Sequence, residues 1–576
     1  MQNYPLYPTR TRLDLAGLWD FAFLSAKENS LQNFDSPAGI SFADKQFVPG
    51  CFDATGPYAG QRGIGIYKTT IKVSKTGKVR LELGATTISA KIFWDNTLIA
   101  VNKLAYSGVA YEFDTTAGKH ELVIAVENRF DTDFNPLAWG YYDFHFAGGI
   151  LRSACLYELP AGTRLGRCIV TTLDRSTGKV RLDAELVDGP QEMIRSLSVA
   201  FDDGEAECYE FSCSNGVATL ELNVPDFKIW SMESPALHTV TIALPDGSDA
   251  ITERFGIRTV EVKGQKILLN GEEIYIAGYN RHEAHPEFGV TLPPGIMMED
   301  LQILRSMNCN FIRGCHYPQD QYFLDLCDEL GFIVWEESLG WGNRPEQGER
   351  DDFCALQREQ TVLMVRNSRN HPCVIMWGFL NECHSHTAPY RALIGNLVRD
   401  IKAIDTTRPT TFASMMIAYG EQCLDLVDIV SCNTYPGWYG VDHNEEEPLQ
   451  KIAPRIEEVM KELEKTELAD KPLIISEIGT AALFGCHDKI RRQQWTEEFQ
   501  NDYIQEVIDV LAERPRIQGL VLWQFTDART YTGSPSLNRA RGFNNKGTLD
   551  EFRREKMVAD TVRNAFAKPP FVKKDK

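Results

Sequence analysis

The sequence lacks a long hydrophobic run. Its longest apolar stretches, such as the one around residues 374–376, have the length of a single strand, whereas a membrane-spanning helix needs about 20 consecutive apolar residues. The first residues, MQNYPLYPTRTRLDLAGLWDF, also lack a basic start followed by an apolar stretch and a small-residue cleavage site, so no secretory signal is visible. We expect a soluble chain with no membrane partner.

Positive charge is in deficit, with 60 Lys and Arg residues against 80 Asp and Glu and a formal net charge of −20. A field of that sign repels phosphate backbones and anionic lipid surfaces, so we exclude nucleic acid as a partner. Hydrophobic residues make up 43% of the chain and charged residues 24%, as is typical of folded proteins. The 576 residues exceed what one hydrophobic core usually holds, which predicts several domains.

Motifs for cofactors are also missing. The 14 cysteines form no Cys-x-x-Cys pair, and several lie in apolar strand patterns, which predicts buried reduced thiols and a cytoplasmic location. His282-Glu-Ala-His285 and His384-Ser-His386 lack the His-Glu-x-x-His spacing of zinc hydrolases. No Gly-x-Gly-x-x-Gly or Walker-type loop follows a predicted strand. We therefore expect no metal and no cofactor.

Short alternating segments split by Gly, Pro, Asp and Asn fill the first part of the chain, from Leu18 to about Tyr157. They predict an antiparallel β-sandwich, with strands that include residues 67–73, 79–83, 90–94 and 121–126. A second set, from about Arg164 to Thr259, has the size and strand spacing of an immunoglobulin-like sandwich.

The pattern changes after Phe255, where apolar strand runs alternate with segments of helical period. Eight such units predict a (β/α)₈ (TIM) barrel. Its expected strands cover residues 274–279, 311–316, 332–336, 374–380, 410–415, 429–435, 473–476 and 519–525, and its helices include 298–307, 357–368, 390–404 and 456–468.

Two glutamates stand at the ends of predicted barrel strands. Glu382 follows the fourth strand in Met-Trp-Gly-Phe-Leu-Asn-Glu, and Glu477 follows the seventh in Leu-Ile-Ile-Ser-Glu. The chemistry of such barrels takes place at the C-terminal ends of the strands. Two carboxylates on either side of a glycosidic bond can supply the acid/base and the nucleophile for its cleavage.

Across nearly its whole length the chain resembles glycoside hydrolase family 2. The matching segments are Phe-Gly-Ile-Arg-Thr-Val-Glu-Val from 255, Leu-Asn-Gly from 269, Arg-Gly-Cys-His-Tyr-Pro from 313, Arg-Asn-His-Pro-Cys-Val-Ile-Met-Trp from 369, Asn381-Glu382 and Ser476-Glu477. The resemblance implies a jelly-roll sugar-binding sandwich over residues 1–160, an immunoglobulin-like sandwich over 161–259 and a catalytic barrel over 260–576. It also implies that Glu382 is the acid/base and Glu477 the nucleophile. The family often has Ser, Thr or Cys where this chain has Gly314, a change beside the sugar subsite.

Within that family, the stretch Arg541-Gly-Phe-Asn-Asn-Lys-Gly is similar to β-glucuronidases of bacteria. Asn544-x-Lys546 resembles the motif by which those enzymes hold the sugar carboxylate, and Arg541 belongs to the same stretch. A protein of net charge −20 needs a local fixed cation to bind an anionic sugar, and a lysine supplies a charge-assisted hydrogen bond. The resemblance therefore implies a retaining exo-acting β-glucuronidase that acts on uronide conjugates or oligosaccharides.

Further sugar-binding residues are implied by motif. Asp143 resembles the aspartate that the N-terminal sandwich contributes to the sugar pocket, and Asn381 is placed to bind the 2-hydroxyl. Four others stand at or just beyond the ends of strands two, six and eight: His316, Tyr435, Tyr439 and Trp523.

Several alternatives stay open. A β-galacturonidase or mixed hexuronidase differs only at C4 of the sugar, which a clamp on the C6 carboxylate does not read. A β-galactosidase would leave Lys546 without an anion, and a non-catalytic carbohydrate-binding protein would not need both glutamates. The segment 338–350 is short and polar, which predicts an open leaving-group side and leaves the role of Arg344 undetermined. We also expect a homo-oligomer.

Overall fold

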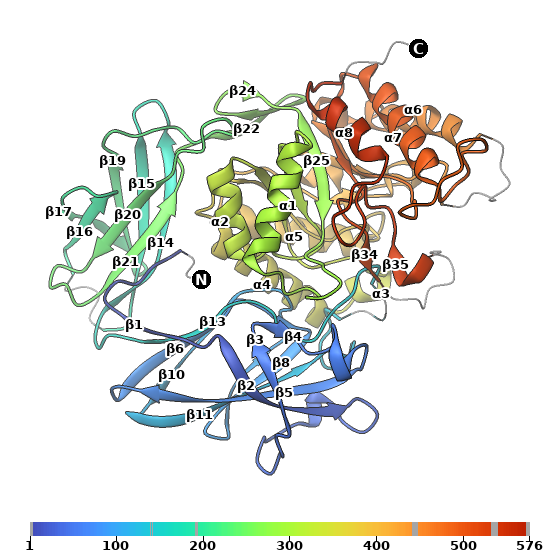
Figure 1. Cartoon of the computed structure of the whole chain (residues 1–576). Coiled ribbons are helices and arrows are strands. Elements are labelled where there is room, and N and C mark those ends of the chain that lie inside the picture. The colour runs from blue at the N-terminus through green and yellow to red at the C-terminus, as the bar shows by residue number, and fades with distance from the viewer. Residues whose placement is uncertain are drawn as a thin grey trace.

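The computed structural model describes residues 4–138, 140, 142–189, 194–439, 447–530 and 539–571. Two β-sandwiches are followed by a barrel of alternating strands and helices (Figure 1). In Figure 1 the first sandwich is blue and lies below, the second is teal to green and lies to the left, and the barrel runs from yellow-green to red. This is the predicted fold class.

The first sandwich packs a six-stranded sheet against a four-stranded sheet, in the orders β3-β2-β5-β11-β8-β9 and β1-β13-β6-β10. Alternate residues of β6, Val79, Leu81 and Leu83, point into the core between the sheets, as the period of a strand requires. The strands are β1 Thr11–Asp14, β2 Gly17–Ser25, β3 Asp44–Val48, β5 Gly63–Val73, β6 Gly77–Leu83, β8 Ser89–Trp94, β9 Thr97–Asn102, β10 Val109–Thr115, β11 Gly118–Glu127 and β13 Ala154–Glu158, with the short β4 Gly50–Cys51, β7 Thr86–Thr87 and β12 Gly149–Ile150 beside them.

The second sandwich has two four-stranded sheets, in the orders β14-β15-β19-β18 and β17-β16-β20-β21. Its strands are β14 Arg164–Asp174, β15 Lys179–Val187, β16 Ser196–Phe201, β17 Glu207–Glu210, β18 Ser212–Ser214, β19 Val217–Asn223, β20 His238–Ala243 and β21 Ala250–Phe255. The start of the chain is tied to this sandwich, because Leu6 pairs with Thr252 and Arg10 forms a buried ion pair of 2.7 Å with Asp249. Residue 160 lies between β13 and β14, and residue 259 lies after β21. These two positions remain the proposed domain boundaries.

The barrel strands form one parallel sheet in the order β29-β28-β27-β26-β25-β33-β32-β31-β30. These strands are β25 Ile276–Arg281, β26 Phe311–Gly314, β27 Ile333–Glu337, β28 Val374–Gly378, β29 Thr410–Thr411, β30 Ala413–Ser414, β31 Val430–Asn433, β32 Leu473–Ile478 and β33 Ile517–Leu522. The predicted fifth strand is split into β29 and β30. Since β29 pairs with β28 and β30 pairs with β31, these two short pieces close the barrel.

Helices surround the barrel: α1 Pro294–Ser306, α2 Gln321–Leu330, α3 Pro345–Gly348, α4 Asp351–Ser368, α5 Ala388–Ile404, α6 Ile452–Glu464, α7 Glu497–Ala512 and α8 Val558–Phe566. The expected helix 456–468 is shifted, because α6 begins at Ile452, ends at Glu464 and is followed by a separate 3₁₀ turn at Glu467–Asp470. A three-stranded antiparallel sheet precedes the barrel, formed by β22 Val260–Lys263, β23 Lys266–Leu269 and β24 Glu272–Glu273. Beyond the last barrel strand, β34 Ala528–Arg529 pairs with β35 Phe543–Asn544.

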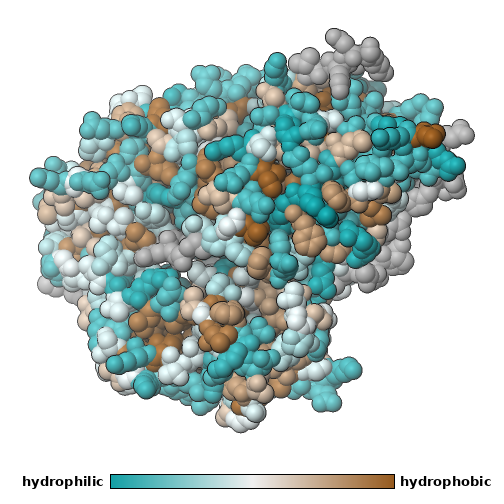
Figure 2. All heavy atoms as spheres, viewed as in Figure 1, coloured by the Kyte–Doolittle hydropathy of each residue, from teal (hydrophilic) through white to brown (hydrophobic). Residues whose placement is uncertain are grey.

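The molecular surface is mixed in character. The face seen in Figure 2 is mostly hydrophilic, with small hydrophobic groups scattered over it. Among the described residues, no helix combines the length and the apolar character that a membrane crossing demands. All 14 cysteines are free thiols.

Candidate active site

Both predicted glutamates lie at the C-terminal mouth of the barrel. Glu477 belongs to the end of β32 and is 3% exposed, while Glu382 follows β28 by four residues. All barrel strands are parallel, so their C-terminal ends meet at one rim. The two sequence positions therefore lie in one site, in which the charge of Glu477 helps to raise the pKa of Glu382.

Glu477 is held by two short hydrogen bonds. Arg313, from β26, donates from Nη1 to Oε1 at 2.6 Å, and the Tyr435 hydroxyl donates to Oε2 at 2.6 Å. Hydrogen bonds from a guanidinium and a phenol stabilise the charged form of a carboxylate. They also fix the orientation of this carboxylate.

Glu382 has a different environment. Burial, and secondly the charge of Glu477, raise its pKa to about 8, so this carboxyl is protonated at neutral pH. Its Oε1 accepts a hydrogen bond of 3.0 Å from Asn433 Nδ2. Its backbone is left-handed, with φ of 52°, a strained conformation for a residue with a side chain. A backbone hydrogen bond of 2.9 Å to Ala413 O helps to hold it there.

Asn381 precedes Glu382 in the chain, and His316 Nε2 lies 4.0 Å from Glu477 Oε1. Asn381 accepts hydrogen bonds from Arg313 Nη2 at 2.9 Å and Asn433 Nδ2 at 3.0 Å, and among the described residues its buried Nδ2 has no partner. The indole of Trp523 stacks on the imidazole of His316, with centroids 5.3 Å apart and rings 12° from parallel. These groups offer a donor and a flat ring surface to a ligand.

A cationic end of the site is built around Lys546, which is 1% exposed. Its Nζ donates to the Tyr439 hydroxyl at 2.7 Å and lies 5.3 Å from the centre of the Trp438 ring. Burial, and secondly the nearby Arg539, lower the pKa of Lys546 well below its usual value. An anionic ligand would reverse that effect, because an opposite charge favours the ammonium form.

Asp143 joins the first sandwich to this cationic end. Its carboxylate accepts hydrogen bonds from Asn544 Nδ2 at 2.9 Å, from Thr530 Oγ1 at 3.0 Å and from Arg539 Nε at 2.7 Å. Arg539 also donates to the Tyr439 hydroxyl at 3.0 Å. Asp143 and Asn544, which are about 400 residues apart in the sequence, are thus in direct contact.

Arg541 is the predicted residue that the structure does not bring into this group. Its guanidinium pairs with Glu551 at 2.9 Å, and its side chain is 52% exposed. The backbone at Arg541 is left-handed, with φ of 59°, so the chain turns between Arg539 and Arg541 and the two side chains have different partners. Arg539 occupies the place expected for Arg541.

Sequence reasoning also missed several residues that contact the predicted ones. Arg313 lies in a segment already noted for its resemblance, and Asn433 stands at the end of β31. His282 packs its ring against those of His316 and Trp523, with centroids 5.6 and 5.5 Å away. Strand-end position was the available signal for all three.

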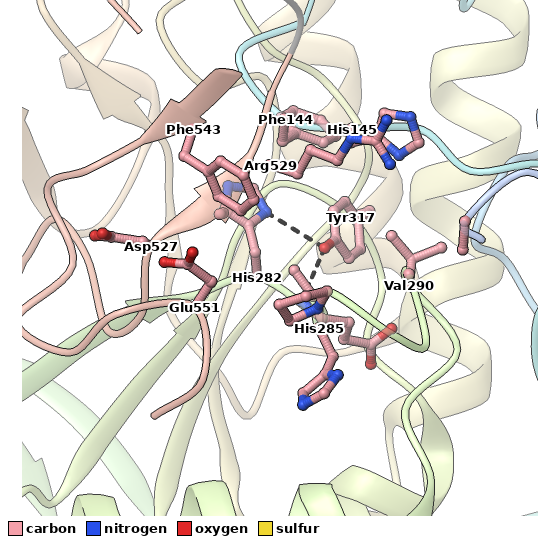
Figure 3. A pocket seen from close by; sticks show the side chains of 16 residues that line it. Phe144, His145, His282, His285, Val290, Tyr317, Asp527, Arg529, Phe543 and Glu551 are labelled. Carbon is pink, nitrogen blue, oxygen red and sulfur yellow. Dashed lines mark hydrogen bonds between the residues drawn. The ribbon is translucent and has the colours of Figure 1, made fainter. Parts of the chain in front are cut away.

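A pocket adjoins these residues (Figure 3). It is lined by Phe144, which follows Asp143, by His282 and Tyr317, and by residues of the C-terminal loops such as Phe543. The His282 imidazole stacks on Phe144 and its Nδ1 lies 3.3 Å from the Tyr317 hydroxyl. Neither Glu382 nor Glu477 lines this pocket.

Two buried groups in the described part of the chain place three metal-ligand atoms within 4.8 Å: His282 with Cys315 and His316, and Asp328 with His371 and Cys373. In the second group, the Asp328 carboxylate already binds the His371 ring at 2.6 Å and the Cys373 backbone at 2.9 Å. The first group lies beside Glu477. That the protein needs no metal stays a prediction.

Comparison with known proteins decides the family. The model "Glycosyl hydrolases family 2, TIM barrel domain" matches residues 260–545, and "Glycosyl hydrolases family 2" matches residues 168–258. The chain belongs to glycoside hydrolase family 2.

Individual relatives agree with this assignment. A β-glucuronidase of Rattus norvegicus is 30% identical over 74% of this chain, which spans 64% of the rat protein's length. One from Streptococcus agalactiae is 27% identical over 98% of both chains. The crystal structure of a family 2 β-galacturonidase from Eisenbergiella tayi, bound to galacturonate, is similar with a TM-score of 0.86 and 28% identity over 99% of both chains.

Proposed function

We propose that this protein is a retaining exo-β-glucuronidase, which releases glucuronic acid from β-D-glucuronides. The observation that carries the proposal is the buried amino group of Lys546, which lies beside Asn544 and Arg539 and within electrostatic reach of Glu477 and Glu382. A neutral sugar gives such a cation no counter-charge, whereas a uronate does. Two relatives over most of this chain carry the name β-glucuronidase.

The proposed mechanism assigns one step to each glutamate. Glu477, oriented by Arg313 and Tyr435, attacks the anomeric carbon while protonated Glu382 donates its proton to the leaving oxygen. Glu382 then removes a proton from the water that hydrolyses the glycosyl-enzyme. The raised pKa of Glu382 supports its role as the acid, and the loss of the Glu477 charge in the intermediate lowers that pKa for its role as base.

Lys546→Ala is expected to lower kcat/KM for an aryl glucuronide by at least ~10-fold, because a charge-assisted hydrogen bond contributes roughly 1.5–3 kcal/mol and each ~1.36 kcal/mol is tenfold in rate. Weak activity on the neutral aryl glucoside should stay unchanged or rise, since that substrate otherwise buries an unpaired ammonium. Arg541→Ala, which removes an exposed cation paired with Glu551, is the control and should leave both rates unaltered. Equal losses on the two substrates would contradict a uronate clamp.

The pH dependence follows from the raised pKa of Glu382. Its acid form is present below about 8 and is lost as pH rises through that value, so hydrolysis of an alkyl glucuronide with a poor leaving group should fall on the alkaline side. An aryl glucuronide with a good leaving group needs little protonation and should lose less. Initial rates measured from pH 5 to 10 on both substrates test this, and identical alkaline limbs would exclude Glu382 as the titrating acid.

A β-galacturonidase is the second candidate, and the similarity to the Eisenbergiella tayi enzyme favours it. Both uronates present the same C6 carboxylate to Lys546 and differ at C4. Parallel rates on aryl β-glucuronide, β-galacturonide and β-galactoside distinguish the two candidates and exclude a galactosidase. A non-catalytic binding protein would be inert on all three.

A cytoplasmic location, a bacterial source and a homo-oligomeric assembly remain predictions. The free state of all 14 cysteines supports a reducing compartment.

A further inference from the structure

Glu337 is a buried carboxylate with no part in the mechanism above, yet it binds two residues of the site. It ends β27 and is fully buried. Its Oε2 accepts from Arg313 Nε at 2.8 Å, and its Oε1 lies 2.9 Å from His316 Nδ1. One carboxylate therefore contacts both the guanidinium that holds Glu477 and the imidazole beside it.

The contact with His316 determines which ring nitrogen carries the proton. Burial, and secondly Arg313, lower the pKa of His316 to about 3, so the ring is neutral and holds one proton. An ionised carboxylate only accepts hydrogen bonds, which places that proton on Nδ1. Arg313 Nη2 also lies 3.3 Å from Nδ1, but each of its two N–H groups has a closer acceptor, Asn381 Oδ1 at 2.9 Å and Glu337 Oε2 at 2.8 Å.

The other ring nitrogen, Nε2, is then left with a lone pair. Among the described residues this buried atom has no hydrogen-bond partner, and it lies 4.0 Å from Glu477 Oε1. Beside the nucleophile, the group that such an acceptor fits is a hydroxyl of the bound sugar. A proton on Nε2 would instead make this nitrogen a donor directed at the Glu477 carboxylate. A hydrogen bond from it would reduce the nucleophilicity of that carboxylate.

We propose that Glu337 is a positioning residue that fixes Arg313 against Glu477 and keeps His316 in the tautomer with its proton on Nδ1, so that Nε2 accepts a sugar hydroxyl. The sugar part of this inference rests on the proposed function; the tautomer does not.

Glu337→Gln tests the inference because the amide has only one orientation that fits. Its oxygen must face the Arg313 Nε–H, so its NH₂ faces His316 Nδ1 and the ring proton moves to Nε2. We expect kcat for an aryl uronide to fall roughly 10- to 100-fold, since a hydrogen bond to a charged group contributes roughly 1.5–3 kcal/mol. KM should change less than kcat, because Lys546 and Asn544 are untouched.

The adjacent Glu336 provides the matched control. It is also fully buried, but as the preceding residue of the strand it points to the opposite face, where it accepts from Gln319 N at 3.1 Å. Glu336→Gln should keep the His316 tautomer and lose less than ~3-fold in kcat, since its partners are the Gln319 backbone amide and the Ser368 hydroxyl, and it contacts neither Arg313 nor His316. Equal losses of kcat in the two variants would show a merely structural role for Glu337 and overturn the proposal.

The tautomer is read without any substrate by ¹⁵N NMR of histidine-labelled protein, with His316 assigned from a His316→Gln sample. We expect Nδ1–H in the native protein and in Glu336→Gln, and Nε2–H in Glu337→Gln. The spectra are recorded at pH 8, because burial raises the pKa of Glu337 to about 7. Nε2–H in the native protein would refute the inference even if the enzyme is a glucuronidase, whereas inactivity on uronides with the expected tautomers would refute only the proposed function.

Discussion

Replacing Glu477 by alanine is expected to reduce kcat on aryl glucuronides by at least about 10⁴-fold, because the nucleophile is lost and no other group can form the glycosyl-enzyme. The cavity left behind should admit a small anion, since the Arg313 and Tyr435 donors that held the carboxylate remain. Azide in the assay should therefore restore part of the activity and yield the α-glycosyl azide, by a single inverting displacement.

The configuration of the azide product shows whether Glu477→Ala has lost only its nucleophile or has failed to fold. A misfolded variant gives no azide adduct at all, and proton NMR of the product distinguishes the α from the β azide. Residual hydrolysis above about 1% of the native rate without azide would contradict the assignment, because catalytic nucleophiles cannot be removed at so small a cost. So would a β-glycosyl azide, which a retaining enzyme forms only when its acid/base is missing.

The fold could be predicted from periodicity to a large extent. β15 alternates strictly between buried and partly exposed residues, and β6 does so from Lys78 onward. The barrel strands begin with apolar runs and are buried on both sides, as parallel sheets require. Periodicity could not predict where each strand and helix ends. The break of the fifth strand into β29 and β30 depends on its pairing with β28 and β31, which is tertiary information.

Some residues of the site could likewise be predicted from the sequence, and others could not. Glu382 and Glu477 could be found because strand-end position in a barrel translates directly into position at the rim. Arg539 could not, because the choice between it and Arg541 depends on the left-handed backbone at Arg541 and on which carboxylate each guanidinium meets. Glu337 was missed for another reason: it is adjacent to Glu336 at the end of the same strand, and only the hydrogen bonds show which of the two faces Arg313.

These contacts give the two glutamates opposite electrostatic environments. Arg313 and Tyr435 stabilise the charge on Glu477, and that charge, together with burial, raises the pKa of Glu382. A carboxyl group with a raised pKa can serve as the acid while a second carboxylate serves as the nucleophile. In this protein that division of roles depends on Arg313, which is held in turn by Glu337.

Glu382→Ala is expected to have an effect that depends on the leaving group. For an alkyl glucuronide, kcat/KM should fall by about 10²- to 10⁴-fold, the contribution of a positioned general acid. For an aryl glucuronide with an acidic phenol, the glycosylation step should be spared, because the phenolate departs without a proton, and slow hydrolysis of the intermediate should appear as a burst followed by a low steady rate.

Azide again supplies the decisive comparison, because it attacks the intermediate without help from a base. It should accelerate the steady rate of Glu382→Ala and yield the β-glycosyl azide, the opposite anomer to that from Glu477→Ala, since two displacements at the anomeric carbon restore the original configuration. If Glu382→Ala instead slowed alkyl and aryl glucuronides equally in the glycosylation step, the carboxyl with a pKa raised to about 8 would not be the acid. The proton for the leaving oxygen would then have to come from another group at the barrel mouth.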